Sequence, residues 1–130
     1  MVERIAGPRE GEMSVEVVQA FRFEAAHYLP NVPDTHRCKN MHGHSYRIDV
    51  HVAGPVDPYS GMVIDFFDVE DAFAPVMKCL DHQILNEVDG LENPTAENIA
   101  IWIFNQLVAL EGLSQVVVHE TEFSRAVYTG

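Results

Sequence analysis

The chain is poor in cysteine and in basic residues, and both shortages restrict what the protein does. Two cysteines among 130 residues are too few for a disulfide framework, so we expect a reducing, cytoplasmic setting. Eight Lys and Arg against 20 Asp and Glu leave a formal net charge of -12, which argues against nucleic-acid binding. No apolar run approaches the roughly 20 residues that span a bilayer. The polar start of the chain also lacks the apolar segment of a secretory signal.

Apolar residues are spaced as in β-strands in four segments of the chain. Two segments come early, and the last two lie close enough to pair as a hairpin; they are residues 14–27, 44–52, 114–123 and 124–129. We expect the polar residues 1–13 to form a flexible lead-in, so that a single domain spans residues 14–130.

Two helices are predicted between the second strand and the third. In residues 65–82 apolar side chains recur every three or four positions, at Phe66, Val69, Phe73, Val76 and Leu80. Pro75 lies inside this pattern and should kink or interrupt the helix. Residues 91–112 form the second helix, with Thr95 as its N-cap and Gly112 as its C-terminal stop. The order ββααββ predicts an α+β domain, an antiparallel sheet with both helices on one face.

A cysteine and two histidines lie within seven residues, in the stretch CKNMHGH at 38–44. His42 and His44 share one strand face because successive side chains of a strand alternate. His27 ends the first strand and lies beside them if the first two strands pair. Three neutral imidazoles leave the fourth position of a zinc ion open, as in catalytic sites. Two alternatives remain: a closed structural site with Cys38 as fourth ligand, or histidines that are only polar loop residues.

Carboxylates occur at three further positions where they suggest chemistry. Asp81 beside His82 can orient the imidazole for proton transfer, but neighbours on a regular helix do not face each other, so the pair needs a helix end or a turn. Glu120 continues an apolar strand face, which indicates either a strand end at the solvent or a buried acid that binds N–H donors of a ligand. Glu97 near a helix N-terminus has the simpler role of stabilising the helix dipole. His36 lies in a loop, where solvent exposure is the default.

The few basic residues are unevenly distributed. Half of the eight fall within 26 positions around the histidine cluster: Arg22, Arg37, Lys39 and Arg47. Such a group suggests a local pocket for a small anionic ligand on an otherwise acidic protein, and ordinary surface charges are the alternative.

Six short motifs together resemble the 6-pyruvoyltetrahydropterin synthase family, in order and approximate spacing, from about Phe21 to Gly130. They are FEAAH, CKNMHGHSY, GMVIDF, LDHQILN, NPTAENIA and HET. Only three residues separate Cys38 from His42, a form similar to the bacterial 6-carboxy-5,6,7,8-tetrahydropterin synthases of the queuosine (7-deazaguanine) pathway. The pyruvoyl-forming enzymes typically have a longer gap.

The resemblance implies a tunnelling fold (T-fold), in which a four-stranded antiparallel sheet carries two helices on one face. It implies homo-oligomers, trimers stacked into hexamers, with active sites at subunit interfaces. Zn²⁺ would be held by His27, His42 and His44. Catalytic roles fall on Cys38, Asp81 and His82. Glu120 would anchor the pterin ring, and Thr95 and Glu97 would line its pocket.

The implied substrate is the small molecule 7,8-dihydroneopterin triphosphate, with 6-carboxytetrahydropterin, acetaldehyde and triphosphate as products. Neither nucleic acid nor membrane is expected as a partner. The alternative enzyme is a 6-pyruvoyltetrahydropterin synthase, which stops before carbon–carbon cleavage. If the protein is not an enzyme, the alternative is a noncatalytic, zinc-stabilised binding module.

Overall fold

The computed structural model describes residues 14–130, and the predicted lead-in over residues 1–13 lies outside this part. Four strands form one antiparallel sheet in the order β1-β2-β3-β4. They are β1 (Val15–His27), β2 (His42–Gly54), β3 (Leu113–His119) and β4 (Arg125–Tyr128). β3 and β4 pair as the predicted hairpin.

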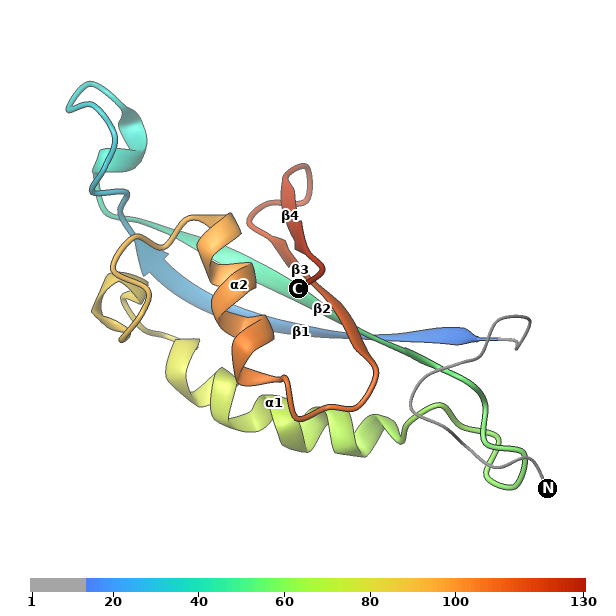
Figure 1. Cartoon of the computed structure of the whole chain (residues 1–130). Helices are drawn as coiled ribbons and strands as arrows, with labels where there is room; N and C mark the ends of the chain where they lie inside the picture. Colours follow the sequence, from blue (N-terminus) through green and yellow to red (C-terminus); the bar gives the residue numbers. More distant parts are fainter. Residues whose placement is uncertain (1–13) are drawn as a thin grey trace.

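Two α-helices connect β2 to β3 and lie on the same side of the sheet (Figure 1). They are α1 (Phe66–Leu80) and α2 (Ala96–Gln106), with the 3₁₀ turns η1 (Arg37–Lys39) and η2 (Leu85–Glu87) elsewhere in the chain. α1 packs against β1, and α2 packs against β3 and β4. The predicted α+β fold with order ββααββ is therefore confirmed. No helix within residues 14–130 is long and apolar enough to cross a membrane.

α1 follows its predicted apolar stripe with two differences. Val69, Phe73, Val76 and Leu80 are buried as expected, but Phe66 is 49% exposed because it is the first residue of the helix. Pro75 does not interrupt the helix, which runs unbroken to Leu80. At the N-terminus the side chain of Asp65 accepts a hydrogen bond from the N–H of Phe67 and caps the first turn.

α2 begins as predicted and ends earlier. The hydroxyl oxygen of Thr95 accepts a hydrogen bond from the N–H of Asn98 at 3.1 Å, which confirms the N-cap. The helix ends at Gln106, not near Gly112. Gly112 instead lies where the chain turns back against β2: its φ is 87°, and a Cβ there would be 2.5 Å from the carbonyl oxygen of Ala53. A glycine is required by both facts.

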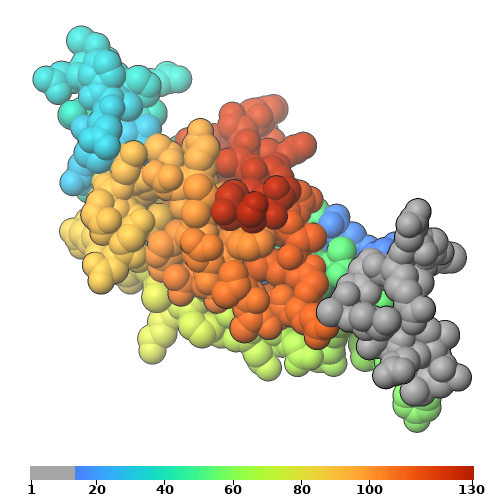
Figure 2. All heavy atoms as spheres, in the orientation of Figure 1, coloured from blue at the N-terminus to red at the C-terminus, as the bar shows by residue number. Residues whose placement is uncertain are grey.

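The two faces of the sheet differ in composition. The face toward the helices carries the core, in which Phe21 stacks on Phe73 and Phe23 stacks on Tyr46. The opposite face is free of helices and carries mostly polar side chains. At one end of the sheet the β1–β2 connection, residues 28–41, projects from the body of the molecule (Figure 2).

Candidate metal centre

Three histidines converge at the end of the β1–β2 hairpin. The register places His27 directly opposite His42 and Ala25 opposite His44, so that all three imidazoles lie on the helix-covered face. Their ring centroids are 4.5 to 5.1 Å apart. One nitrogen of each lies within 4.8 Å of the others. The predicted grouping is confirmed, and it results from the pairing of the two strands.

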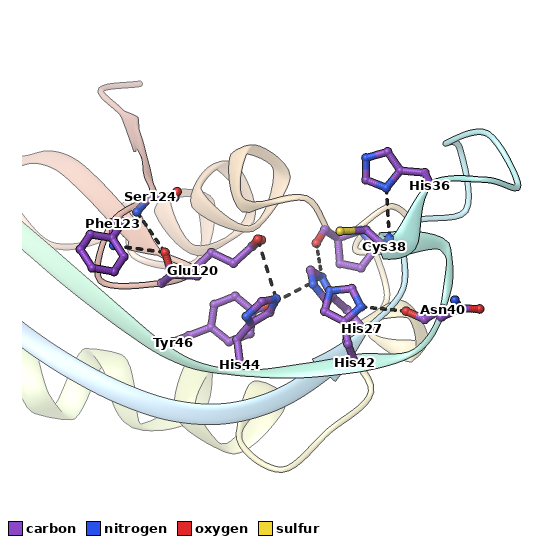
Figure 3. A network of polar contacts seen from close by, with 12 residues as sticks. His27, His36, Cys38, Asn40, His42, His44, Tyr46, Glu120, Phe123 and Ser124 are labelled. Atoms are coloured by element: carbon purple, nitrogen blue, oxygen red, sulfur yellow. Dashed lines mark hydrogen bonds and ion pairs between the residues drawn. The ribbon is translucent and has the colours of Figure 1, made fainter.

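The hydrogen bonds of these rings leave their other nitrogens free to bind a metal. His27 Nδ1 is 2.8 Å from the carbonyl oxygen of Pro94, and His42 Nδ1 is 2.7 Å from that of Asn40 (Figure 3). A carbonyl accepts only from a protonated nitrogen, so Nε2 of both rings carries the lone pair. His27 Nε2 and His44 Nε2 are buried without a hydrogen-bond partner. The partner-free Nε2 atoms of His27 and His44 and the fixed tautomers of His27 and His42 fit a zinc ion.

Burial favours the neutral, metal-binding form of two of the imidazoles, His27 and His44. Desolvation is the main cause that lowers the pKa of His27, which is only 1% exposed, and it likewise lowers the pKa of His44. The carboxylate of Glu120 opposes this effect, since its Oε1 lies 3.7 Å from His44 Nε2. Beneath the rings, burial raises the pKa of Tyr46, and the charge of Glu120 raises it further.

Cys38 approaches the histidines from the η1 turn, outside the sheet (Figure 3). Among the described residues, the group of candidate ligand atoms within 4.8 Å of one another contains the three histidines and does not contain Cys38. This favours the open, three-histidine arrangement over the closed one. Lys39 does not face the thiol, because its Nζ donates to the carbonyl oxygens of Pro30 and Val32.

The three predicted pterin-pocket residues share one cavity. Thr95, Glu97 and Glu120 all line a space of about 520 Å³ between the start of α2 and the β3–β4 end of the sheet. Glu120 is therefore neither a simple strand end nor fully buried: it lies between this cavity and His44. In Figure 3 it reaches toward the histidines from the end of β3.

Asp81 and His82 are in contact at the C-terminal end of α1, where neighbouring side chains can face each other. Asp81 is the C-cap, and His82 adopts a left-handed φ of 59°. Asp81 Oδ1 accepts from the main-chain N–H of Glu24 and from His82 Nδ1, both at 3.0 Å, and these two bonds lower the pKa of Asp81. His82 Nε2 is left as a proton acceptor on a side chain that is 77% exposed.

The pair lies along the outer edge of β1. The N–H of His82 donates to the carbonyl oxygen of Glu24, and the N–H of Ala26 donates to that of Gln83. Within residues 14–130, no hydrogen bond or ion pair joins Asp81 or His82 to Cys38, Glu120 or the three histidines. His82 borders a second cavity of about 440 Å³, which Glu24, His44 and Ser45 also line.

Three supporting residues were not identified from the sequence. Asn40 and Pro94 act through main-chain carbonyls, which every residue carries, so no sequence signal marks them. His36, expected to be merely exposed, accepts a hydrogen bond from the N–H of Cys38. Its position two residues before Cys38, at the start of a turn, is the only signal that indicates such a cap.

Nearly all of the described chain is similar to known proteins. Residues 16–130 match the family described as 6-pyruvoyl tetrahydropterin synthase. The 6-carboxy-5,6,7,8-tetrahydropterin synthase of Synechocystis sp. is 42% identical over 119 residues, which cover 86% of this chain and 91% of the relative. The 6-pyruvoyl tetrahydrobiopterin synthase of Drosophila melanogaster is 35% identical over 126 residues, with 83% and 75% covered.

The solved structures agree with the sequence comparison. The Caenorhabditis elegans 6-pyruvoyl tetrahydropterin synthase superposes with a TM-score of 0.84 at 30% identity, covering 92% of this chain and 97% of that one. The shared fold agrees with the one implied by the motifs.

Proposed function

The chain belongs to the 6-pyruvoyl tetrahydropterin synthase family, and from this membership we propose that it is a zinc-dependent 6-carboxy-5,6,7,8-tetrahydropterin synthase. With one water, 7,8-dihydroneopterin triphosphate gives 6-carboxy-5,6,7,8-tetrahydropterin, acetaldehyde and triphosphate, a step of queuosine (7-deazaguanine) biosynthesis. The relative from Synechocystis sp. carries this name, and the short spacing between Cys38 and His42 supports the same branch.

The observation that carries the proposal is the convergence of three imidazoles, each with one nitrogen within 4.8 Å of the others. His27, His42 and His44 would hold the zinc ion and leave one coordination position for substrate. A bound zinc acts there as a Lewis acid on the side-chain hydroxyls of the substrate.

Cys38 would act as the base that removes a proton from the substrate side chain. Its main chain is fixed by His36, and its side chain approaches the three histidines without belonging to their ligand group. A positioned thiolate outside the metal's ligand set is free to accept a proton.

Asp81 and His82 would supply the second proton-transfer group, in the active site of a neighbouring subunit. Asp81 holds His82 by its Nδ1, which leaves Nε2 exposed to accept or deliver a proton. Because the pair lies on the outer edge of β1, a second subunit is the simplest way to bring it to a zinc site. This arrangement fits homo-oligomers, trimers stacked into hexamers.

Glu120, Thr95 and Glu97 would bind the pterin ring in the cavity of about 520 Å³ that they line. The carboxylate of Glu120 would accept paired, charge-assisted hydrogen bonds from ring N–H groups. The oxygen of Thr95 already caps α2, so its hydroxyl proton is the group left to donate to a ligand.

Product analysis tests the proposal. The zinc-loaded protein is incubated with 7,8-dihydroneopterin triphosphate, the pterins are identified by mass spectrometry, and acetaldehyde is assayed alongside. Carboxypterin with acetaldehyde is the expected result. A pyruvoyl product without acetaldehyde identifies the alternative, a 6-pyruvoyl tetrahydropterin synthase, which the relatives from Drosophila and C. elegans favour.

If the folded, zinc-loaded protein does not convert the substrate, the remaining alternative is the noncatalytic binding module. In that case chelation should unfold the domain without any pterin turnover to lose. The exposed His82, which Asp81 holds in one tautomer, argues against a purely structural metal site.

A further inference from the structure

The β1–β2 connection, residues 28–41, carries Cys38 but contributes no side chain to the hydrophobic core of the described chain. Its turn η1, which contains Cys38, has no buried residue. The connection also projects from the body of the molecule, so few other segments can support it (Figure 2). Apolar packing therefore does not fix the position of the thiol, and hydrogen bonds within the connection have to do so.

Asn86 of η2 anchors the base of this connection. Its Oδ1 accepts a hydrogen bond from the N–H of Tyr28 at 3.0 Å, and its Nδ2 donates to the carbonyl oxygen of Tyr28 at 2.8 Å. The N–H of Leu29 then donates to the carbonyl oxygen of Cys38 at 2.8 Å. Farther out, residues 30–34 have hydrogen bonds only to other residues of the connection, among the residues that the structure describes. The outer part of the connection is thus held from within.

Lys39 supplies the bonds that hold this outer part. Its Nζ is 2.9 Å from the carbonyl oxygen of Pro30 and 3.2 Å from that of Val32. No main-chain N–H within residues 14–130 donates to either carbonyl. An ammonium group has three donors and no acceptor, so one side chain can bind several carbonyls at once. Because Lys39 follows Cys38 in the η1 turn, these bonds tie the outer part to the turn that carries the thiol.

The third contact of Lys39, with a carboxylate, is the weaker one. Nζ lies 3.6 Å from Asp34 Oδ1, and the Asp34 side chain is 96% exposed. Solvent screens such a pair, which typically contributes little to stability. The two carbonyl oxygens accept hydrogen bonds from a charged donor at shorter distances, and such bonds are stronger than neutral ones. The bonds from Lys39 to Pro30 and Val32 are here named the lysine clamp.

We propose that Lys39 is a positioning residue, whose ammonium group closes the β1–β2 connection and so fixes Cys38 near the three histidines. Lys39 acts through the main chain and not on the thiol, because its Nζ is bonded to the two carbonyl oxygens. The positioning role rests on the function proposed above, since the place of Cys38 affects turnover only if its thiol takes part. One member of the basic group in the sequence thus binds the chain's own carbonyls.

Hydrogen–deuterium exchange tests the lysine clamp without turnover. The N–H groups of Leu29 and His36 are both bonded inside the connection. In zinc-loaded Lys39→Ala they should exchange at least about tenfold faster than in the wild type, the factor expected for loss of one charge-assisted hydrogen bond. The N–H groups of β2, which pair within the sheet, should exchange at the wild-type rate. Wild-type exchange of Leu29 and His36 in the variant would overturn the proposal.

Kinetics test whether the lysine clamp serves the reaction. Lys39→Ala should lower kcat by about 10- to 100-fold, as expected when a reacting group is displaced. KM and zinc content should not change, since Lys39 contacts neither the cavity that Glu120 lines nor the three histidines. Faster exchange with an unchanged kcat would overturn the positioning role. A wild type without turnover would refute the proposed function and the positioning role with it, whereas the exchange measurement decides the clamp on its own.

Rescue separates the loss of the ammonium group from a general disturbance of the connection. Propylammonium supplies the carbons and the nitrogen that Lys39→Ala removes, and it should restore part of the slow exchange and of kcat. Tetramethylammonium at equal ionic strength has no N–H donor and should restore neither. Lys39→Arg keeps the charge and the donors, so it should stay closer to wild type than Lys39→Ala. If neither propylammonium nor arginine slows the exchange, the hydrogen bonds of the ammonium group are not the cause and the proposal fails.

Two variants serve as matched controls. Asp34→Asn removes only the exposed ion pair and should leave exchange and kcat within about twofold of the wild type. Lys78→Ala makes the same substitution at an exposed position on α1 and should change neither. If Asp34→Asn is as damaging as Lys39→Ala, the ion pair holds the connection and the carbonyl clamp is refuted. An equal effect of Lys78→Ala would mean that the loss of charge alone is responsible, which also contradicts the proposal.

Discussion

His36 Nδ1 accepts a hydrogen bond from the main-chain N–H of Cys38 at 3.0 Å. On the other side of the same residue, the carbonyl oxygen of Cys38 accepts from the N–H of Leu29 at 2.8 Å. Lys39 closes the loop by donating to the carbonyl oxygens of Pro30 and Val32. Cys38 is therefore held by loop contacts and not by strand pairing, and its position depends on a few side chains.

We predict that His36→Leu lowers kcat by about 10- to 100-fold, because small displacements of a reacting group are that costly. KM and zinc content should be unchanged, since His36 contacts neither the cavity that Glu120 lines nor the three histidines. His36→Asn, which restores a capping oxygen, should recover most of the activity. If His36→Leu and His36→Asn are equally impaired, the cap is not the cause.

Cys38→Ala should keep one zinc per chain and lose turnover. The reason is that the thiol lies outside the group of ligand atoms formed by the three histidines. Metal analysis by atomic absorption and a product assay check both halves. Cys79→Ala, at an exposed position on α1, is the matched control and should behave as wild type. Loss of zinc from Cys38→Ala would support the closed structural site.

Complementation between two inactive variants should reveal a shared active site. Cys38→Ala and His82→Ala are each expected to be inactive alone, but chains of both kinds assembled together should regain activity. If the thiol and the imidazole come from different subunits, on the order of a quarter of the sites in random cyclic oligomers contain both. A mixture that stays inactive while the subunits demonstrably exchange would place both groups in one chain.

Glu120→Gln should raise the KM for the pterin by about tenfold or more, as expected for loss of a charged hydrogen-bond acceptor. Initial-rate kinetics over a range of substrate concentrations give KM and kcat separately. Glu97→Gln, in the same cavity but at the exposed start of α2, should have the smaller effect. An effect on kcat with KM unchanged would show that Glu120 acts in the chemistry, through His44, and not in binding.

Acid should remove the stabilising effect of Asp49. Burial alone would raise the pKa of Asp49, but hydrogen bonds from His119 and Arg47 outweigh it, and the pKa is lowered. The stabilisation is thus present above the unfolded-state pKa of about 3.9 and is lost as the pH falls through the lower folded value.

We therefore expect Asp49→Asn to be less stable than wild type by about 1–2 kcal/mol at neutral pH, with the difference closing below about pH 4. Urea unfolding in the presence of a chelator measures this without interference from metal release. Glu70→Gln, at an exposed position on α1, should show no such difference. If the stability difference between wild type and Asp49→Asn persists in acid, the shape of the Asp49 side chain, and not its charge, is responsible.

Short-range patterns in the sequence were sufficient to predict the elements. The alternation of side chains put His42 and His44 on one face, and the cap at Thr95 and the helix end at Asp81 were found where the sequence indicates them. These features depend on the geometry of a few consecutive residues. The predicted end of α2 was wrong, because the residues after Gln106 continue an apolar helical pattern. The close packing of Gly112 against Ala53 requires the chain to turn there instead.

The sequence by itself determined which residues could bind a metal and on which strand face they lie, since that follows from local backbone geometry. Only the tertiary structure decided which partners they meet. The register opposes His27 to His42, and the fold brings Pro94 to His27 and Glu120 to His44. Such contacts join residues far apart in the chain, and their positions depend on how the helices and strands pack together, which no local pattern specifies.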